Sequence, residues 1–129
     1  MRILVVDDFV TMRRVVRTFL REIGFAEQDI VEAASGTGAL ERLRAEAVDV
    51  VVTDIEMPTL GGFELLSAIR RDARWRHLPV LMVTAEATKE EIVRCTQAGA
   101  TAYLVKPFTR AVLEEKLRSA IPSAFASNE

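Results

Sequence analysis

Short apolar runs alternate with amphipathic stretches along the whole chain. Five runs of mainly β-branched and aliphatic residues predict buried strands, at 3–6, 30–31, 48–53, 80–83 and 102–105. Apolar residues at helical spacing predict helices over 11–23, after Ser35, over 63–69, from Thr88 to Gly99 and after Thr109. Repeated strand and helix with short connections predicts a parallel sheet covered by helices on both faces.

Capping and turn residues mark where several of these elements begin and end. Thr88 is followed three residues later by Glu91, the capping-box pattern of a helix N-terminus. Gly24 can cap the first helix at its C-terminal end. Residues 123–129 carry no pattern, so we expect a short flexible tail after a domain that spans 1–122.

The composition describes one globular domain and excludes several classes of protein. The chain has 129 residues, of which 50% are hydrophobic and 28% charged. The net charge of −2 predicts neither a nucleic-acid nor a membrane partner. The single cysteine, Cys95, cannot form an internal disulfide, and the sequence shows neither a signal peptide nor a membrane-spanning run. We therefore expect a cytoplasmic monomer.

Chemically distinctive residues stand where four of the predicted strands end. They are Asp7 with Asp8, Asp54, Thr84 and Lys106, which follow the first, third, fourth and fifth runs. Because the carboxyl ends of parallel strands face one crevice, we expect these side chains to converge at one edge of the sheet.

Three carboxylates, a hydroxyl and an ammonium at one edge suit the transfer of a phosphoryl group to a carboxylate. Such a transfer brings negative charge onto negative charge, so cations must neutralise it. Mg²⁺ prefers oxygen ligands and is usually held by one or two carboxylates. Lys106 offers a fixed positive charge, and the Thr84 hydroxyl can donate a hydrogen bond. The interpretation we favour is that Asp54 accepts the phosphoryl group.

Each of these residues also has an ordinary structural explanation. Asp7 and Asp8 could form a turn and a helix cap, and Asp54 before a Met-Pro pair could be a turn former. Thr84 suits a strand, and Lys106 could be an exposed lysine. Separate coincidences at four strand ends are harder to sustain than one shared site, which favours the functional interpretation.

In these motifs the sequence resembles the receiver domains of two-component response regulators, most closely the single-domain chemotaxis regulators. The matching positions are 5–9, 11–14, 54, 57–58, 79–86, 97–100, 103, 106–109 and 113–117. They cover nearly the whole chain and keep the family's spacing. The resemblance implies an α/β, flavodoxin-like (βα)5 fold, a doubly wound five-stranded parallel sheet with strand order 2-1-3-4-5.

The resemblance also implies roles for residues around the acceptor. Asp8 and Asp54 would bind Mg²⁺ directly, Asp7 would act through water, and Glu56 would offer its backbone carbonyl. Lys106 would contact the acceptor and then a phosphoryl oxygen. The bond between Lys106 and Pro107 resembles the family's cis peptide.

The resemblance also implies residues that act in conformational switching, in the lifetime of the phosphorylated form and in partner binding. Thr84 and Tyr103 would move inward together after phosphorylation. Glu56 and Glu86 flank the path of attacking water, so we expect them to tune the lifetime of the phosphorylated form. The implied partner surface consists of Lys89, Ile92, Tyr103 and Lys116.

The implied partners are a chemotaxis-type sensor histidine kinase as donor, a flagellar motor switch protein and a phosphatase. The protein would catalyse only its own phosphorylation and dephosphorylation. A phosphorelay intermediate or a phosphate sink without a motor target stays open as an alternative. An aspartyl-phosphate phosphatase of the haloacid dehalogenase type would need an acidic residue at Phe9. A flavodoxin-like flavin binder is disfavoured because Asp7 and Asp8 would repel an anionic phosphate.

Overall fold

The computed structural model describes residues 1–125 of the chain. Its five strands form one parallel sheet in the order β2-β1-β3-β4-β5. The strands are β1 (Ile3–Val6), β2 (Ile30–Ala33), β3 (Val50–Asp54), β4 (Val80–Thr84) and β5 (Ala102–Val105). This arrangement confirms the predicted flavodoxin-like fold and its strand order.

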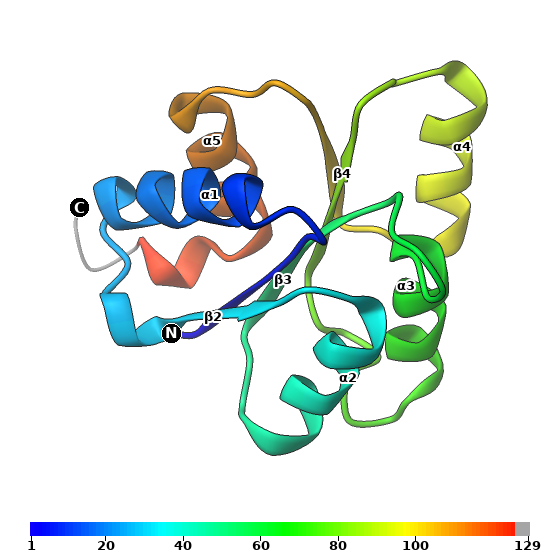
Figure 1. Ribbon diagram of the computed structural model, residues 1–129, viewed down its shortest axis with the longest axis horizontal. Helices are drawn as coiled ribbons and strands as arrows, with labels where there is room; N and C mark the ends of the chain where they lie inside the picture. The colour runs from blue at the N-terminus through cyan, green and yellow to red at the C-terminus, as the bar shows by residue number, and fades with distance from the viewer. Residues whose placement is uncertain (126–129) are drawn as a thin grey trace.

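Five α-helices cover the two faces of the sheet (Figure 1). They are α1 (Val10–Ile23), α2 (Gly36–Ala45), α3 (Gly62–Arg71), α4 (Lys89–Ala98) and α5 (Arg110–Ala120). Helices α1 and α5 pack on one face, and α2, α3 and α4 pack on the other. Within 1–125, none of the helices combines the length and apolarity needed to cross a bilayer.

The strands read as continuous apolar runs because both of their faces are buried. In β1, Leu4 and Val6 belong to the core beneath α2, α3 and α4, whereas Ile3 and Val5 belong to the core beneath α1 and α5. All four side chains are at most 1% exposed. Successive residues of a strand point to opposite faces, so a strand between two helical layers needs an apolar residue at every position.

Three predicted helix caps are present. The hydroxyls of Ser35, Thr88 and Thr109 each accept a hydrogen bond from the backbone N–H three residues later. These bonds satisfy donors that the first turn of a helix leaves without partners, and they fix where α2, α4 and α5 begin.

The third strand lies further along the chain than the sequence pattern predicted. It was expected over 48–53 and runs from Val50 to Asp54, so Asp54 is itself paired in the sheet, opposite Val83. The acceptor candidate is therefore the last residue of a central strand, with a backbone fixed by the sheet.

The expectation of a flexible tail from residue 123 is wrong in part. Pro122–Ala124 form a 3-10 turn, and Phe125 is buried. The Phe125 ring meets the Phe25 ring edge to face at a centroid distance of 6.5 Å, and the Arg118 guanidinium lies over it. This aromatic contact explains why the ordered chain continues past residue 122. The rest of the expected tail, 126–129, lies outside the described residues.

Candidate functional site

The acidic residues predicted to converge lie together at the carboxyl edge of the sheet. Asp7, Asp8 and Asp54 each place a carboxylate oxygen within 4.8 Å of the others. Strands β1 and β3 are neighbours with Val6 opposite Thr53, so the residues that follow this pair are adjacent. Asp7 and Asp54 are 3% and 7% exposed, which makes their mutual repulsion strong.

Lys106 reaches this acidic cluster from the end of β5. Its Nζ lies 3.3 Å from Oδ2 of Asp7 and 3.3 Å from Oδ2 of Asp54. The peptide bond between Lys106 and Pro107 is cis, as the resemblance implied. The predicted contact between Lys106 and Asp54 is present.

Burial and neighbouring charges shift the pKa values of the two partners. Burial raises the pKa of Asp54; the Lys106 ammonium opposes this, the Asp7 carboxylate adds to it, and the net pKa stays raised. Burial alone would lower the pKa of Lys106, but attraction by Asp54 and Asp7 outweighs it and raises that pKa. Lys106 therefore holds its proton more firmly than an exposed lysine, and Asp54 loses its proton less readily than an exposed aspartate.

The carboxylates fit a divalent cation that prefers oxygen ligands. Oδ1 of Asp8 is buried and, among residues 1–125, has no hydrogen-bond partner. Both oxygens of Asp7 are engaged: Oδ1 accepts from the Phe9 N–H at 2.9 Å, and Oδ2 contacts Lys106. A buried carboxylate oxygen without a donor suits a metal ion. Oδ1 of Asp8 is therefore available to a cation, and the direct role of Asp8 and the indirect role of Asp7 stay predictions.

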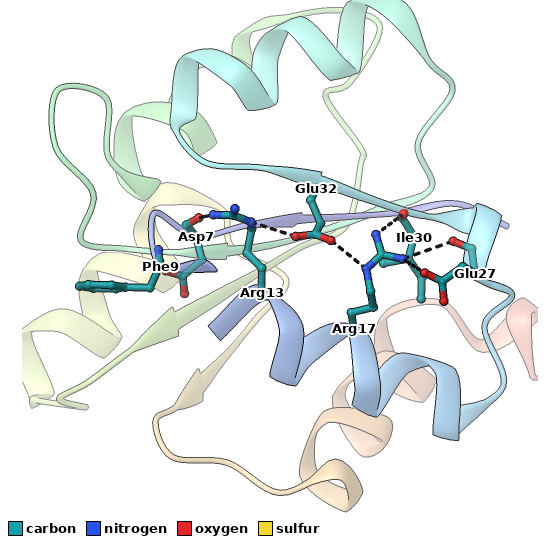
Figure 2. A network of polar contacts seen from close by, with 7 residues as sticks. All are labelled: Asp7, Phe9, Arg13, Arg17, Glu27, Ile30 and Glu32. Atoms are coloured by element: carbon teal, nitrogen blue, oxygen red, sulfur yellow. Dashed lines mark hydrogen bonds and ion pairs between the residues drawn. The ribbon is translucent and has the colours of Figure 1, made fainter. Parts of the chain in front are cut away.

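A second group of residues, not identified from the sequence, holds the loop between β1 and α1 in place. Arg13 on α1 donates through Nη1 to the backbone carbonyl of Asp7 at 2.7 Å and through Nε to Glu32 on β2 at 2.9 Å (Figure 2). The other carboxylate oxygen of Glu32 accepts from Nε of Arg17 at 2.8 Å. Arg13 therefore connects the acidic loop to the edge strand of the sheet.

Arg17 anchors the far end of this network. It donates to the backbone carbonyl of Ile30 at 3.0 Å and to the carboxylate of Glu27 at 2.6 Å (Figure 2). Burial raises the pKa of Glu32, but hydrogen bonds from Arg17 and Arg13 outweigh burial, so that pKa is lowered. Glu32 is ionised at neutral pH and serves as the shared acceptor of two guanidinium groups.

Thr84 lies at the predicted edge, but its hydroxyl contacts Glu86 and Glu91 and not Asp54. Oγ1 accepts from the Glu86 N–H at 3.1 Å and lies 2.9 Å from the Glu86 carbonyl oxygen. It also lies 3.0 Å from Oε1 of Glu91, on the first turn of α4. Within the part of the chain that the structure describes, the Thr84 hydroxyl makes no hydrogen bond to Asp54 or Lys106. The Thr84 backbone carbonyl does accept a hydrogen bond from the Lys106 N–H, at 2.8 Å.

Glu56 and Glu86, which are expected to tune the lifetime of the phosphorylated form, have exposed side chains. Their backbones, not their side chains, contact the site. The Glu56 N–H faces the Asp54 carboxylate and slightly opposes the rise in the pKa of Asp54. The Glu86 backbone holds the Thr84 hydroxyl. Glu56 also lines an open cavity of about 740 Å³ between the β3–α3 loop and the first turn of α4.

The residues of the expected partner surface lie on α4, β5 and α5. Tyr103 is half-buried on β5, and the Lys116 ammonium on α5 lies 5.8 Å from the centre of its ring. Lys89 is exposed at the start of α4, and Ile92 is half-buried one turn later.

Comparison with known proteins agrees with this geometry. Residues 3–118 match the model of the response regulator receiver domain. The chain is 51% identical over 117 residues to chemotaxis protein CheY of Pseudomonas aeruginosa, an alignment that covers 91% of this chain and 93% of that protein. It is 52% identical to CheY-3 of Vibrio cholerae, covering 91% of this chain and 88% of that protein.

Solved structures give the same result. CheY4 of Vibrio cholerae superposes with a TM-score of 0.85 at 32% identity, covering 93% of this chain and 98% of that one. The receiver domain of a sensor histidine kinase from Pseudomonas aeruginosa, with a magnesium ion coordinated in its active site cleft, superposes with a TM-score of 0.83 at 30% identity, covering 94% and 97%. The chain therefore belongs to the response regulator receiver domain family and is closely related to the CheY chemotaxis regulators.

Proposed function

We propose that this protein is a signalling switch in which Asp54 accepts a phosphoryl group from the phosphohistidine of a CheA-like sensor histidine kinase. The observation that carries the proposal is the position of Lys106, 3.3 Å from a carboxylate oxygen of Asp54. A cation at that distance can stabilise the charge that accumulates when a carboxylate attacks phosphorus.

The transfer exchanges one bond to phosphorus for another. A carboxylate oxygen of Asp54 forms the new O–P bond, the N–P bond of the phosphohistidine breaks, and its electron pair stays on the imidazole nitrogen. Lys106 then pairs with a phosphoryl oxygen. Asp8 and Asp54 would hold Mg²⁺ directly, with Asp7 acting through water and Glu56 through its carbonyl. The ion would supply the charge neutralisation that the attack requires.

Thr84 and Tyr103 would change position in response to the new phosphoryl group. Once an oxygen acceptor with more negative charge lies beside Asp54, the Thr84 hydroxyl turns to donate to it, and Tyr103 moves inward. This biases an equilibrium between two arrangements of α4, β5 and α5. The altered surface, with Lys89, Ile92, Tyr103 and Lys116, would bind a flagellar motor switch protein.

The apolar character of that surface supports a protein partner. Val93 on α4, Val105 on β5 and Val112 on α5 are 46%, 37% and 38% exposed. Exposed apolar side chains on adjoining elements are typical of interaction sites. The protein would act as a cytoplasmic monomer, with its signal ended by hydrolysis that Glu56 and Glu86 tune or that a phosphatase accelerates.

A phosphorelay intermediate or phosphate sink is the second candidate. Receiver domains of sensor histidine kinases are among the solved structures that this chain resembles. The higher identity to chemotaxis proteins, 51% and 52%, favours the motor target.

The test is transfer of a radiolabelled phosphoryl group from a phosphorylated CheA phosphotransfer domain. Label should move to the wild-type chain only with Mg²⁺ and should not move to Asp54→Asn. Phosphorylation-dependent binding of a peptide from the motor switch protein would then separate the two candidates. Transfer without any gain in peptide binding would support the relay or sink, and no transfer would contradict both.

A further inference from the structure

The side chain of Glu91 does not occupy the place that its sequence position predicts. In a capping box, the glutamate reaches back to the backbone N–H of the capping threonine. The threonine half of that motif is present, because the Thr88 hydroxyl accepts from the Glu91 N–H at 3.2 Å. The Glu91 carboxylate instead contacts the Thr84 hydroxyl at 3.0 Å, and no hydrogen bond to the Thr88 N–H is found within 1–125.

The Thr84 hydroxyl has one hydrogen to donate and two acceptors beside it. These are the Glu86 carbonyl oxygen at 2.9 Å and the Glu91 carboxylate at 3.0 Å. A charged acceptor forms the stronger hydrogen bond. Thr84 is only 4% exposed, so water competes weakly for that hydrogen.

The hydrogen held by Glu91 is the one that the proposed phosphorylated state needs. A phosphoryl oxygen on Asp54 can receive it only if the contact with Glu91 is given up, because one O–H donates one strong hydrogen bond. Glu91 is also fixed to α4, two residues after Lys89 and beside Ile92. The same contact therefore joins the Thr84 hydroxyl to the helix that carries part of the expected partner surface.

We propose that Glu91 is a positioning residue that holds the Thr84 hydroxyl in the resting arrangement and thereby opposes the response of α4 to the phosphoryl group. This inference rests on the proposed function and adds a specific restraint to it. The restraint would set how much interaction energy a phosphoryl group must supply before Thr84 and α4 change conformation.

Glu90 provides a matched control. It stands next to Glu91 in the first turn of α4, carries the same charge and is exposed, and it makes no side-chain hydrogen bond among the described residues. Substituting either glutamate removes one negative charge from the same helix terminus. Only the substitution of Glu91 removes the contact with Thr84.

The experiment is a titration with beryllofluoride, a phosphoryl stand-in, in saturating Mg²⁺, followed through the NMR signals of Thr84. Relative to wild type, Glu91→Ala should bind about five- to tenfold more tightly, since one charge-assisted hydrogen bond no longer competes. Glu91→Gln keeps an oxygen acceptor, so its affinity for beryllofluoride should rise less than that of Glu91→Ala. Glu90→Ala should change the affinity by less than about twofold. In metal-free protein, the Thr84 side-chain shifts should change in Glu91→Ala and not in Glu90→Ala.

Three results would overturn the inference while leaving the proposed function intact. The first is an unchanged affinity for beryllofluoride in Glu91→Ala, and the second is a gain in affinity in Glu90→Ala as large as that in Glu91→Ala. The third is the same gain in affinity in Glu91→Gln as in Glu91→Ala, which would show that the loss of charge alone causes the effect. Failure of the wild-type protein to form any complex with beryllofluoride and Mg²⁺ would instead contradict the proposed function, and the restraint with it.

Discussion

The ammonium nitrogen of Lys106 lies 3.3 Å from Oδ2 of Asp54, although Asp54 ends β3, Lys106 follows β5, and β4 lies between these two strands. The same nitrogen is 3.3 Å from Asp7. Within residues 1–125, Lys106 is the one cationic side chain that pairs with this group of three carboxylates. The site is therefore short of positive charge until a metal ion is bound, and this imbalance has consequences for stability.

Replacing Asp54 by asparagine should stabilise the metal-free protein. Because the pKa of Asp54 is raised in the folded state, its ionisation favours unfolding, and stability falls as pH rises from the ordinary carboxyl pKa through the raised one. At pH 7 with a chelator, we expect Asp54→Asn to exceed wild type by on the order of 1 kcal/mol in urea unfolding.

The advantage of Asp54→Asn should disappear in strongly acidic buffer, where Asp54 is protonated in both states. Added Mg²⁺ should stabilise wild type more than the variant, because only wild type keeps the full set of carboxylates. A variant less stable than wild type in chelator at pH 7 would contradict this account.

Arg13 should stabilise the acidic loop and support metal binding. Arg13→Met removes the donor to the Asp7 carbonyl and one of the two cations that hold Glu32. We expect a loss of about 1–3 kcal/mol in the free energy of unfolding and a several-fold weaker affinity for Mg²⁺ by calorimetry. Arg14→Met is the control, since Arg14 is exposed on the same helix.

The pH dependence of the Arg13 effect follows from Glu32. Its lowered pKa means that the stability it contributes is present above the ordinary carboxyl pKa and is lost as pH falls through the lowered one. The difference between wild type and Arg13→Met should therefore shrink in acid. Equal losses of unfolding free energy in Arg13→Met and Arg14→Met would show that the hydrogen bonds of Arg13 do not stabilise the acidic loop.

Gly62 should be intolerant of a side chain. A Cβ at this position would clash with the carbonyl oxygen of Asp54 and lie 2.8 Å from the Cα of Ile55, both of which are backbone atoms. We expect Gly62→Ala to cost about 2–4 kcal/mol and to displace Asp54, which chemical denaturation and Mg²⁺ titration would detect. Gly38→Ala, whose nearest neighbour would be the Ser35 hydroxyl at 3.2 Å, should stay within about 1 kcal/mol of wild type.

Glu56 should influence how long the phosphoryl group survives. Its side chain is exposed at the cavity beside Asp54, where a carboxylate can orient water or repel the phosphoryl group. We expect the dephosphorylation rate of Glu56→Asn to differ from that of wild type, measured by loss of label after the donor is removed. Glu64→Gln, on the same cavity, should leave the rate unchanged. Identical rates in wild type and Glu56→Asn would rule out this role.

Sequence reasoning succeeded where one local signal determines the outcome. The apolar runs predict the strands, and because parallel strands share one carboxyl edge, the positions of Asp7, Asp54 and Lys106 after those runs were enough to predict their meeting. Thr88 and Thr109 similarly predicted helix starts, since a cap depends on residues three positions apart.

The parts that could not be predicted depend on how separate elements lie side by side. Arg13 meets Glu32, 19 residues away, only because α1 lies across β2. The Glu91 carboxylate had two possible hydrogen-bond donors, the Thr88 N–H and the Thr84 hydroxyl. Its contact with Thr84 depends on where the end of β4 places that residue. Burial of Phe125 required a ring on another element, Phe25, which no local pattern reveals.

The most direct test of the central claim is to locate the phosphoryl group after incubation with acetyl phosphate, with and without Mg²⁺. Trp75 lies in the connection before β4, at the opposite end of that strand from Thr84, so intact mass and peptide mapping are better readouts than fluorescence. We predict the mass of one phosphoryl group, dependent on Mg²⁺, on the peptide that contains Asp54, and no gain in Asp54→Asn. A phosphoryl group on another residue, or the same gain in Asp54→Asn, would contradict the assignment of Asp54 as acceptor.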